Sequence, residues 1–589
     1  MLQYPFDGAA ILQKKRALKK ELSQKAGLTD KKIAIVSGST VGEIRNILEL
    51  FLLNNGIRPT FWEGGYALFY ENVVFDDGSL AAFAPDVLYI HTSNRNIKNW
   101  PLPGDTKAQA EEKLAAEFGL FKAVWQAAEK LGCPVVQNNF ELPLWRNFGN
   151  MDSFDGRGRV HYVQELNRQM ARYAAEHKNF YIHDLNYLAA LHGLDEWCDT
   201  EAWYAYKYAC APGHIPDLCH SLASLVSSLF GRTKKSVVLD LDNTLWGGVI
   251  GEVGPEGIEL GKETPTGMAY AEFQEYLKML AQRGILLNVA SKNEEALAAA
   301  GFERADSPLK KQDFLCFEAN WEPKSQSLAK MAAQLNILPD SFVFMDDNPA
   351  EREQVGRELP GVTIPEVGQP EASVRLLDRG GYFEVSTLSA DDVKRGEMYR
   401  QNAERQQVEQ SFGNYEDYLK SLAMAAHIGP FQPEQVERVT QLINKTNQFN
   451  FTTRRYTAAE TTACMQSPAY ITLAGRLVDK FGDNGLTAAI IGHINGTNLD
   501  IDLWIMSCRV FKRHFEYAMF DELVRLCAGQ GVKTITGRWL PTAKNLLIKD
   551  FYATIGFDLT AETEQERVFV YILPAKYANK NTVIEVERT

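Results

Sequence analysis

The sequence has few of the features that mark several common protein classes. Its eight cysteines are scattered and form no C-x-x-C pair, so their spacing predicts neither a zinc ribbon nor a redox dithiol. No run of about 18 apolar residues occurs, and the first residues lack the basic region and apolar core of a secretory signal. We therefore expect a cytoplasmic protein with reduced, mostly buried thiols and no membrane partner.

The sequence also has fewer basic than acidic residues. The formal net charge is −13 at pH 7, with 62 lysines and arginines against 75 aspartates and glutamates. Nonspecific nucleic-acid binding needs a basic excess to neutralise phosphates, so we expect no nucleic-acid partner. Hydrophobic residues make up 45% and charged residues 23%, as in ordinary globular proteins. A small metabolite or another protein is the expected ligand.

What the sequence does contain is a pair of aspartates at the end of an apolar stretch. Residues 237–239 have the pattern of a buried parallel strand, and Asp240 and Asp242 follow it. Open α/β sheets bind ligands at the carboxyl ends of their strands, where this pair is expected. One carboxylate could attack phosphorus while the other handles the leaving-group proton. Taken alone, the D-x-D-x-T string is equally typical of a turn with a capping threonine.

Further along the chain lie groups that suit an oxyanion. The apolar pattern at 285–290 ends in Ser291, Lys292 and Asn293, and Lys324 begins a predicted helix. Hydroxyl, amide and ammonium groups are the donors that phosphate oxygens accept. We therefore expect these four side chains to bind phosphate.

A second acidic pair, Asp346 and Asp347, ends a third apolar strand pattern at 341–345. Mg²⁺ takes hard oxygen ligands from carboxylates, water and substrate phosphate. Together with Asp240 and Asp242, the second pair can supply such a site. The cation would offset the repulsion between an anionic nucleophile and an anionic phosphate. The sequence thus predicts a magnesium-dependent phosphoryl-transfer site.

These motifs, in this order, resemble the haloacid dehalogenase (HAD) superfamily of phosphotransferases. The resemblance implies that Asp240 is the nucleophile, which forms an aspartyl-phosphate, and that Asp242 is the general acid/base. It also implies that Ser291 and Lys324 bind phosphate and that the acidic pair at 346–347 binds the metal.

Three strings narrow the resemblance to subfamily IIIC and to the FkbH-like proteins. They are Leu-Trp-Gly-Gly-Val-Ile-Gly-Glu at 245–252, Ser-Lys-Asn at 291–293, and Asp-Asp-Asn-Pro-Ala-Glu-Arg-Glu at 346–353. The resemblance implies that the enzyme accepts 1,3-bisphosphoglycerate and removes phosphate. It would then hold the glyceryl group on a cysteine as a thioester and pass it to an acyl carrier protein. Cys508 is the candidate thiol, because Arg509 beside it could lower its pKa. The alternative is a plain phosphatase acting on a phosphorylated sugar or small acid in polysaccharide biosynthesis.

The interval between Asp242 and Ser291 is too short for a large cap domain. It holds a glycine-rich stretch at 247–261, which we expect to form a β flap, and one helix at 268–282. An uncapped site suits a bulky or carrier-borne substrate, but also a phosphate monoester within a larger glycan or lipid precursor. A non-enzymatic scaffold is a third interpretation. The presence of every expected motif residue argues against it.

In the first 232 residues, β and α patterns alternate, which predicts a parallel sheet. Ser39 and Asn94 each follow a strand pattern, and Asp217 and His220 have D-x-x-H spacing. These positions resemble the SGNH-like N-terminal domain of FkbH-like proteins, with Ser-Gly-Ser in place of the usual Gly-Asp-Ser. The resemblance implies that the four residues are remnants of an esterase site. A hydrolase and a binding or docking domain both stay open.

Residues 421–589 resemble the GNAT acyltransferase fold, with a long strand at 499–506 and a helix at 515–527. In that fold a glycine-rich turn at a helix N-terminus holds the pyrophosphate of acyl-CoA. The corresponding turn here contains no glycine, although Lys512 and Arg513 could attract phosphate by charge. Acyl-CoA, a phosphopantetheine arm on a carrier protein, and a domain retained for packing are the open alternatives.

The expected fold class is α/β with several domains. A Rossmann-like, doubly wound HAD core without a large cap occupies 233–385. An SGNH-like α/β domain at 1–232 precedes it. A helical connector at 386–420 leads to a GNAT-like α+β domain at 421–589.

Overall fold

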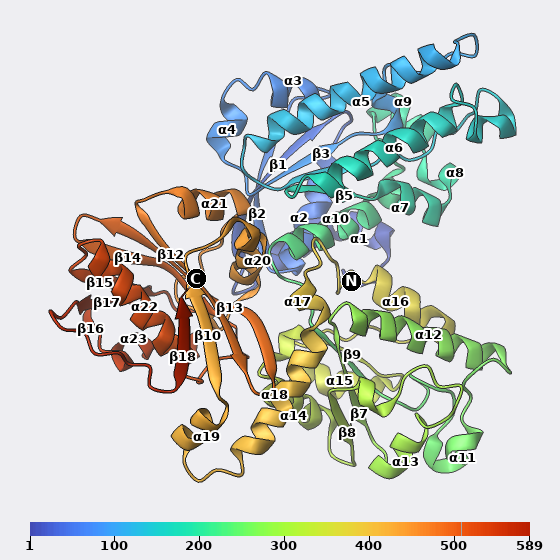
Figure 1. Ribbon diagram of the computed structural model, residues 1–589. Coiled ribbons are helices and arrows are strands. Elements are labelled where there is room, and N and C mark those ends of the chain that lie inside the picture. The colour runs from blue at the N-terminus through green and yellow to red at the C-terminus, as the bar shows by residue number, and fades with distance from the viewer. Residues whose placement is uncertain (508, 543, 589) are drawn as a thin grey trace. The chain divides into compact units, whose positions relative to one another are not determined.

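The computed structural model describes residues 1–507, 509–542 and 544–588 (Figure 1). The chain divides into two compact units, Met1–Phe230 and Gly231–Thr589. Both contain helices together with parallel strands, so the chain is an α/β protein, as the sequence predicts. In the described part of the chain, no helix combines the length and apolar character needed to traverse a bilayer.

The first unit is built on a parallel sheet, the N-terminal sheet, with strand order β2-β1-β3-β4-β5. Its strands are β1 (Thr29–Ser37), β2 (Ile57–Glu63), β3 (Val87–His91), β4 (Val135–Asn138) and β5 (Phe180–His183). The longer helices are α1 (Gly8–Leu22), α2 (Gly42–Asn54), α5 (Lys107–Glu129), α6 (Arg159–Glu176) and α10 (Ile215–Leu229). The shorter helices are α3 (Phe69–Val74), α4 (Ser79–Phe83), α7 (Leu185–His192), α8 (Leu194–Trp197) and α9 (Thr200–Tyr206).

Alternate residues of β1 enter different cores. Ile33 and Ile35 belong to a cluster with residues of α2 and α10, whereas Ala34 and Val36 belong to one with residues of α5 and α6. Because successive side chains of a strand point to opposite faces, helices cover both faces of the N-terminal sheet. Burial on both faces explains the nearly continuous apolar run that β1 shows in the sequence.

The second unit begins with another parallel sheet, the central sheet, with strand order β8-β7-β6-β9. Its strands are β6 (Ser236–Leu239), β7 (Leu286–Ser291), β8 (Cys316–Ala319) and β9 (Phe342–Met345). Its helices are α11 (Ile250–Gly257), α12 (Pro265–Gln282), α13 (Glu295–Ala300), α14 (Lys324–Leu335), α15 (Pro349–Glu358) and α16 (Ser373–Arg379). Strands β6 and β9 are direct neighbours, so their carboxyl ends lie at one place.

The prediction of a β flap at 247–261 is correct at the base of this segment and wrong for the residues between. Gly247 and Glu259 exchange two backbone hydrogen bonds of 2.9 and 2.8 Å, as a flap requires. Between them the chain forms α11, which is kinked at Gly254. The backbone N–H of Ile250, the first residue of α11, donates to the distant carboxylate of Asp242. A hydrogen bond that no local pattern reveals thus anchors the start of this helix.

The rest of the second unit forms a mainly antiparallel sheet, the C-terminal sheet, with strand order β16-β17-β15-β14-β13-β12-β10-β18. Its strands are β10 (Met424–Gly429), β12 (Tyr470–Asp479), β13 (Gly482–Asn495), β14 (Asn498–Met506), β15 (Thr534–Trp539), β16 (Asp558–Glu562), β17 (Arg567–Ile572) and β18 (Ile584–Arg588). Three helices precede β10 in the chain: α17 (Ala390–Val393), α18 (Arg395–Glu409) and α19 (Tyr415–Ser421). The helices that follow β10 are α20 (Val436–Lys445), α21 (Ala458–Gln466), α22 (Phe515–Gly529) and α23 (Phe551–Thr554).

Strands β14 and β15 pair in parallel only over Asn498–Asp500 and Thr534–Thr536. Beyond that point the short strand β11 (Phe449–Asn450) pairs with the end of β14. The next residue, Phe451, accepts a hydrogen bond of 2.8 Å from the backbone of Leu540, just after β15. The segment around β11 therefore bridges the two strands where they diverge.

Candidate active site

Three carboxylates meet at the carboxyl edge of the central sheet. Asp240 follows β6 directly, and its backbone N–H donates to the carbonyl of Met345, the last residue of β9, at 2.9 Å. Asp346 and Asp347 follow β9. Side-chain oxygens of Asp240, Asp346 and Asp347 lie within 4.8 Å of one another. We refer to these three residues as the aspartate cluster.

Lys324, the first residue of α14, places its ammonium among these carboxylates. Its Nζ lies 3.0 Å from Asp240 Oδ1 and 2.5 Å from Asp346 Oδ2. All three side chains are buried, with at most 9% exposure. A buried charge without its partner is costly, so this contact fixes the positions of both carboxylates.

The aspartate cluster carries more negative charge than Lys324 balances. Burial raises the pKa of Asp240 to about 6, against the effect of Lys324 and with that of Asp346. Burial also raises the pKa values of Asp346 and Asp347. Burial would lower the pKa of Lys324, but the adjacent carboxylates outweigh it and raise that pKa. Three hard oxygen donors with a charge excess fit a divalent cation such as Mg²⁺.

The carboxylate of Asp242 is held apart from the aspartate cluster. Its Oδ1 accepts hydrogen bonds from Trp246 Nε1 at 2.9 Å and from the backbone of Ile250 at 3.0 Å. Its Oδ2 accepts from Asn293 Nδ2 at 3.0 Å. Among the described residues, the carboxylates that lie close enough to hold one ion are those of Asp240, Asp346 and Asp347, and the Asp242 carboxylate is not one of them. The prediction that Asp242 binds the metal through its carboxylate differs from this geometry, because three donors already engage its oxygens.

The predicted phosphate-binding residues fall into two groups. Asn293 donates to Ser291 Oγ at 3.1 Å as well as to Asp242, so it links the expected phosphate-binding hydroxyl to the expected acid/base. Lys292 instead places its Nζ 2.5 Å from Glu351 Oε1 on α15. The structure thus gives Lys292 an ion-pair partner beside the site.

Two supporting residues were missed by the sequence analysis. Arg352 donates through Nη1 to the backbone carbonyls of both Asp346 and Asp347, at 2.7 Å each. Thr244 accepts a hydrogen bond of 3.3 Å from the backbone N–H of Asp347. Both residues occur in the motif strings, as the threonine of D-x-D-x-T and the arginine after the second acidic pair. Thr244 thus ties the loop after β9 to the loop after β6, and Arg352 ties it to α15.

In the first unit, the structure does not join Ser39 and His220 as nucleophile and base. Ser39 is buried, and its hydroxyl has no hydrogen-bond partner among the described residues. The ring of His220 stacks against Phe6 and packs beside Phe51, with centroid distances of 5.3 Å in both cases. An apolar aromatic environment of this kind is a packing role for His220.

The other two predicted remnants have partners of their own. Asp217 Oδ1 lies 3.6 Å from His192 Nε2. Asn94 donates through Nδ2 to Glu141 Oε1 at 2.9 Å. Burial raises the pKa of Glu141 to about 8, although hydrogen bonds from backbone N–H groups oppose it. Asn94 and Glu141 thus form a buried polar pair that the D-x-x-H spacing did not suggest.

The turn before α22 differs from a glycine-rich anion site in its side chains. Lys512 and His514 both adopt the left-handed backbone conformation, with φ of 67° and 63°, which usually favours glycine. Arg513 is buried and lies 3.2 Å from Asp479, so its predicted availability to phosphate is wrong. Cys508, the candidate thiol, lies outside the described residues.

No family model and no curated protein matches the chain. Among solved structures, the chain is similar to the N-terminal part of the protein BF1531 from Bacteroides fragilis, which contains a phosphatase domain complexed with Mg. The identity is 26% and the TM-score 0.59, over 64% of this chain and 99% of that one. It is also similar to the ribosomal-protein-S18-alanine N-acetyltransferase of Escherichia coli, with 14% identity and a TM-score of 0.21, over 27% of this chain and 98% of that one. It is similar as well to Ard1 of Thermoplasma volcanium, with 19% identity and a TM-score of 0.20, over 26% of this chain and 99% of that one.

Proposed function

We propose that the chain is a Mg²⁺-dependent phosphatase of the HAD superfamily, subfamily IIIC, of the FkbH type. The observation that carries the proposal is the buried contact of Lys324 with Asp240 and Asp346 at the carboxyl edge of the central sheet. The similarity to the phosphatase domain of BF1531 supports the same activity. A phosphorylated small molecule is the proposed substrate.

The first chemical step is attack by a carboxylate oxygen of Asp240 on phosphorus. The new bond joins Asp240 to the phosphoryl group while the bond to the leaving oxygen breaks. Asp242 transfers a proton to that oxygen, and Lys324 donates hydrogen bonds to phosphate oxygens. Mg²⁺ bound by the aspartate cluster would supply positive charge that offsets repulsion between substrate and carboxylates.

In the second step, Asp242 accepts a proton from water as the water attacks the aspartyl-phosphate. Inorganic phosphate leaves and Asp240 is regenerated. Asp242 accepts three hydrogen bonds, which hold its side chain in place for this transfer. They also fix its orientation relative to Asn293.

Replacing Asp240 tests the site directly. We expect Asp240→Asn to abolish phosphate release from p-nitrophenyl phosphate, with Asp378→Asn, an exposed aspartate, as the matched control. Asp242→Asn should leave the first step partly active and slow the second, so intact mass should reveal a trapped phosphoryl group. Activity retained in Asp240→Asn would refute the assignment.

The finer proposal is that the glyceryl group of 1,3-bisphosphoglycerate is kept and passed to an acyl carrier protein. Asp240 first removes the 3-phosphate by the two steps above. A thiolate sulfur then attacks the acyl carbon, the bond to the acyl phosphate oxygen breaks, and the second phosphate leaves. The glyceryl group is now a thioester, from which the carrier thiol displaces the enzyme thiol. Burial raises the pKa of all the described cysteines, which makes them poor thiolates: Cys133, Cys198, Cys210, Cys219, Cys316, Cys464 and Cys527. This supports Cys508 as the thiol.

Intact mass after incubation with Mg²⁺ and 1,3-bisphosphoglycerate tests this route. We expect a glyceryl adduct that Cys508→Ala removes and the control Cys464→Ala keeps. Phosphate release without any adduct would leave the plain phosphatase, acting on a phosphorylated sugar or small acid. An adduct that persists in Cys508→Ala would exclude that thiol.

We also propose a role for each domain of the chain. Residues 233–385 form the phosphatase domain, 386–420 the connector and 421–589 a GNAT-like domain, with an SGNH-like domain at 1–232. The side chains in the turn at 509–514 favour a carrier-docking or packing role for the GNAT-like domain over acyl-CoA binding.

A further inference from the structure

A second polar site lies at the opposite end of the central sheet from the aspartate cluster. It is a cavity of about 120 Å³ whose lining includes Lys235 and Asp340. Lys235 immediately precedes β6 and Asp340 lies just before β9, whereas Asp240 and Asp346 follow these strands. At about 3.3 Å per residue, the backbones of Lys235 and Asp240, which flank β6, are roughly 16 Å apart. The cavity is therefore separate from the proposed active site.

The lining is strongly basic. Its described cationic side chains are Lys235, Arg395, Arg438, Lys445, Arg509 and Lys544. They come from the start of the central sheet, from α18, from α20 and from the segments that follow β14 and β15. Segments far apart in the sequence thus bring positive charge to one small volume, in a chain whose net charge is −13.

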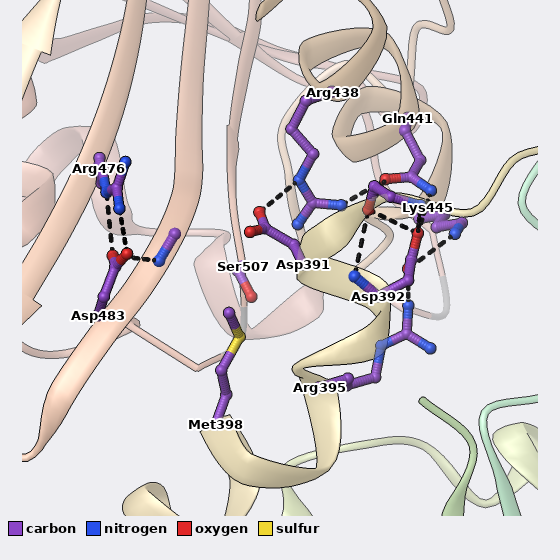
Figure 2. A network of polar contacts seen from close by, with 12 residues as sticks. Asp391, Asp392, Arg395, Met398, Arg438, Gln441, Lys445, Arg476, Asp483 and Ser507 are labelled. Carbon is purple, nitrogen blue, oxygen red and sulfur yellow. Dashed lines mark hydrogen bonds and ion pairs between the residues drawn. The ribbon is translucent and has the colours of Figure 1, made fainter. Parts of the chain in front are cut away.

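Carboxylates next to the cavity neutralise part of this charge, as Figure 2 shows. Arg438 Nε lies 2.9 Å from Asp391, and Lys445 Nζ lies 3.3 Å from Asp392. Arg395 also pairs with Asp392, so two basic side chains share one carboxylate.

Lys544 pairs with Asp340, which also lines the cavity. Arg509 donates through Nε to Ser507 Oγ at 3.2 Å, and its Nη1 lies against the sulfur of Met398. Six basic side chains line the cavity, and the carboxylates of Asp340, Asp391 and Asp392 lie beside some of them.

The basic side chains repel one another. Burial, together with the charges of Arg395 and Arg438, lowers the pKa of Lys445 to about 8, against the effect of Asp392. Burial likewise lowers the pKa of Arg438, with Arg509 and Arg395 adding to the effect and Asp391 opposing it. Like charges held together in a partly dehydrated volume are unfavourable unless an anion joins them.

We propose that this cavity binds a phosphate group. Guanidinium and ammonium groups are the side chains that bind phosphate most strongly, and Ser507 adds a hydroxyl to the lining. Pockets for drug-sized ligands have volumes of about 300–1,000 Å³, so this cavity has room for a phosphate group and few further atoms. The phosphate can come from a free phosphorylated metabolite or from a phosphopantetheine arm, since both present the same charged group.

Binding is measured by isothermal titration calorimetry on the full chain in the presence of EDTA, so that the aspartate cluster has no cation to attract an anion. We expect inorganic phosphate to bind at one site, with an affinity that falls as salt rises. Lys445→Gln and Lys544→Gln should each weaken binding at least tenfold. The matched control is Lys330→Gln, an exposed lysine on α14. Asp240→Asn should bind as tightly as the wild type.

The inference is overturned if the wild type does not bind phosphate, if Lys445→Gln and Lys544→Gln bind like Lys330→Gln, or if Asp240→Asn loses binding. Because Lys445 belongs to a buried network, its variant is first checked for folding by circular dichroism. If it is unfolded, Lys544→Gln decides, since Lys544 is 41% exposed. Comparing 3-phosphoglycerate with 4′-phosphopantetheine identifies the source of the phosphate. No turnover is measured, so the result is independent of the proposed phosphatase activity.

Discussion

The ammonium of Lys324 lies 2.5 Å from a carboxylate oxygen of Asp346, in a place where neither side chain is more than 4% exposed. Removing the ammonium would leave Asp346 and Asp240 buried without their cation. The loss of one partner from a buried ion pair typically costs about 3–5 kcal/mol. The structure therefore makes Lys324 both a stabilising residue and an expected phosphate ligand.

Lys324→Met should lower the unfolding temperature in EDTA, and less so in millimolar Mg²⁺. The cation compensates the same carboxylates, and a ligand that binds only the folded state stabilises it. Thermal unfolding with and without Mg²⁺ measures the difference, with Lys330→Met on the same helix as control. An equal drop in both conditions would contradict a shared role of Lys324 and the metal.

Asn293→Ala should lower kcat by roughly ten- to a hundredfold and leave Mg²⁺ affinity unchanged. Asn293 donates to Asp242 and Ser291 but belongs to no part of the aspartate cluster. Loss of one hydrogen bond to a charged group costs about 1.5–3 kcal/mol, which here would misorient the acid/base. Steady-state kinetics at several Mg²⁺ concentrations separate the two parameters. A change in metal affinity alone would argue against the assignment.

Stability should depend on pH through Glu141, whose pKa burial raises from 4.5 to about 8. Between these values the folded state holds a proton that the unfolded state has lost. The free energy of unfolding therefore falls as pH rises from about 4.5 to about 8. Glu141→Gln lacks this dependence, so its stability relative to wild type should grow by about 2–4 kcal/mol between pH 5 and pH 8.5. Urea unfolding at both pH values is the measurement; a constant difference would rule out the titration of Glu141.

Gly284→Ala should destabilise the second unit. Gly284 has a φ of 84°, and an added Cβ would lie 1.9 Å from the carbonyl oxygen of Asp392. Gly396→Ala is the control, since Gly396 lies inside helix α18 with open space around it and alanine favours the helix. We expect a lower unfolding temperature for the first variant and an unchanged or higher one for the second. Similar unfolding temperatures would mean that the two segments separate readily.

The sequence predicts the aspartate cluster because its residues follow buried parallel strands. The apolar runs that become β6 and β9 have no polar face, and such strands must lie inside a covered sheet. Because β6 and β9 pair in parallel, their carboxyl ends bring Asp240 and Asp346 together, although the apolar patterns alone do not give this strand order. Lys324 is recognisable by its motif, although its distance from Asp346 is not.

Features built from separate segments escaped prediction. The position of the Asp242 carboxylate depends on hydrogen bonds from Asn293 and Ile250, which no spacing encodes. The basic cavity combines side chains as distant in sequence as Lys235 and Lys544, each of which looks like an ordinary surface charge in its own segment. Only the packing of the C-terminal sheet beside the central sheet within the second unit creates it.

The short strand β11 also has a consequence for self-association. Where β14 and β15 diverge, the end of β14 would otherwise expose unpaired backbone groups, and such edges are templates for pairing with other chains. Phe449 and Asn450 occupy that edge at Met506 and Ile505, and Phe451 engages the chain after β15. The protein thus closes the gap with a piece of its own backbone, so Ile505 and Met506 offer no open strand edge to another chain.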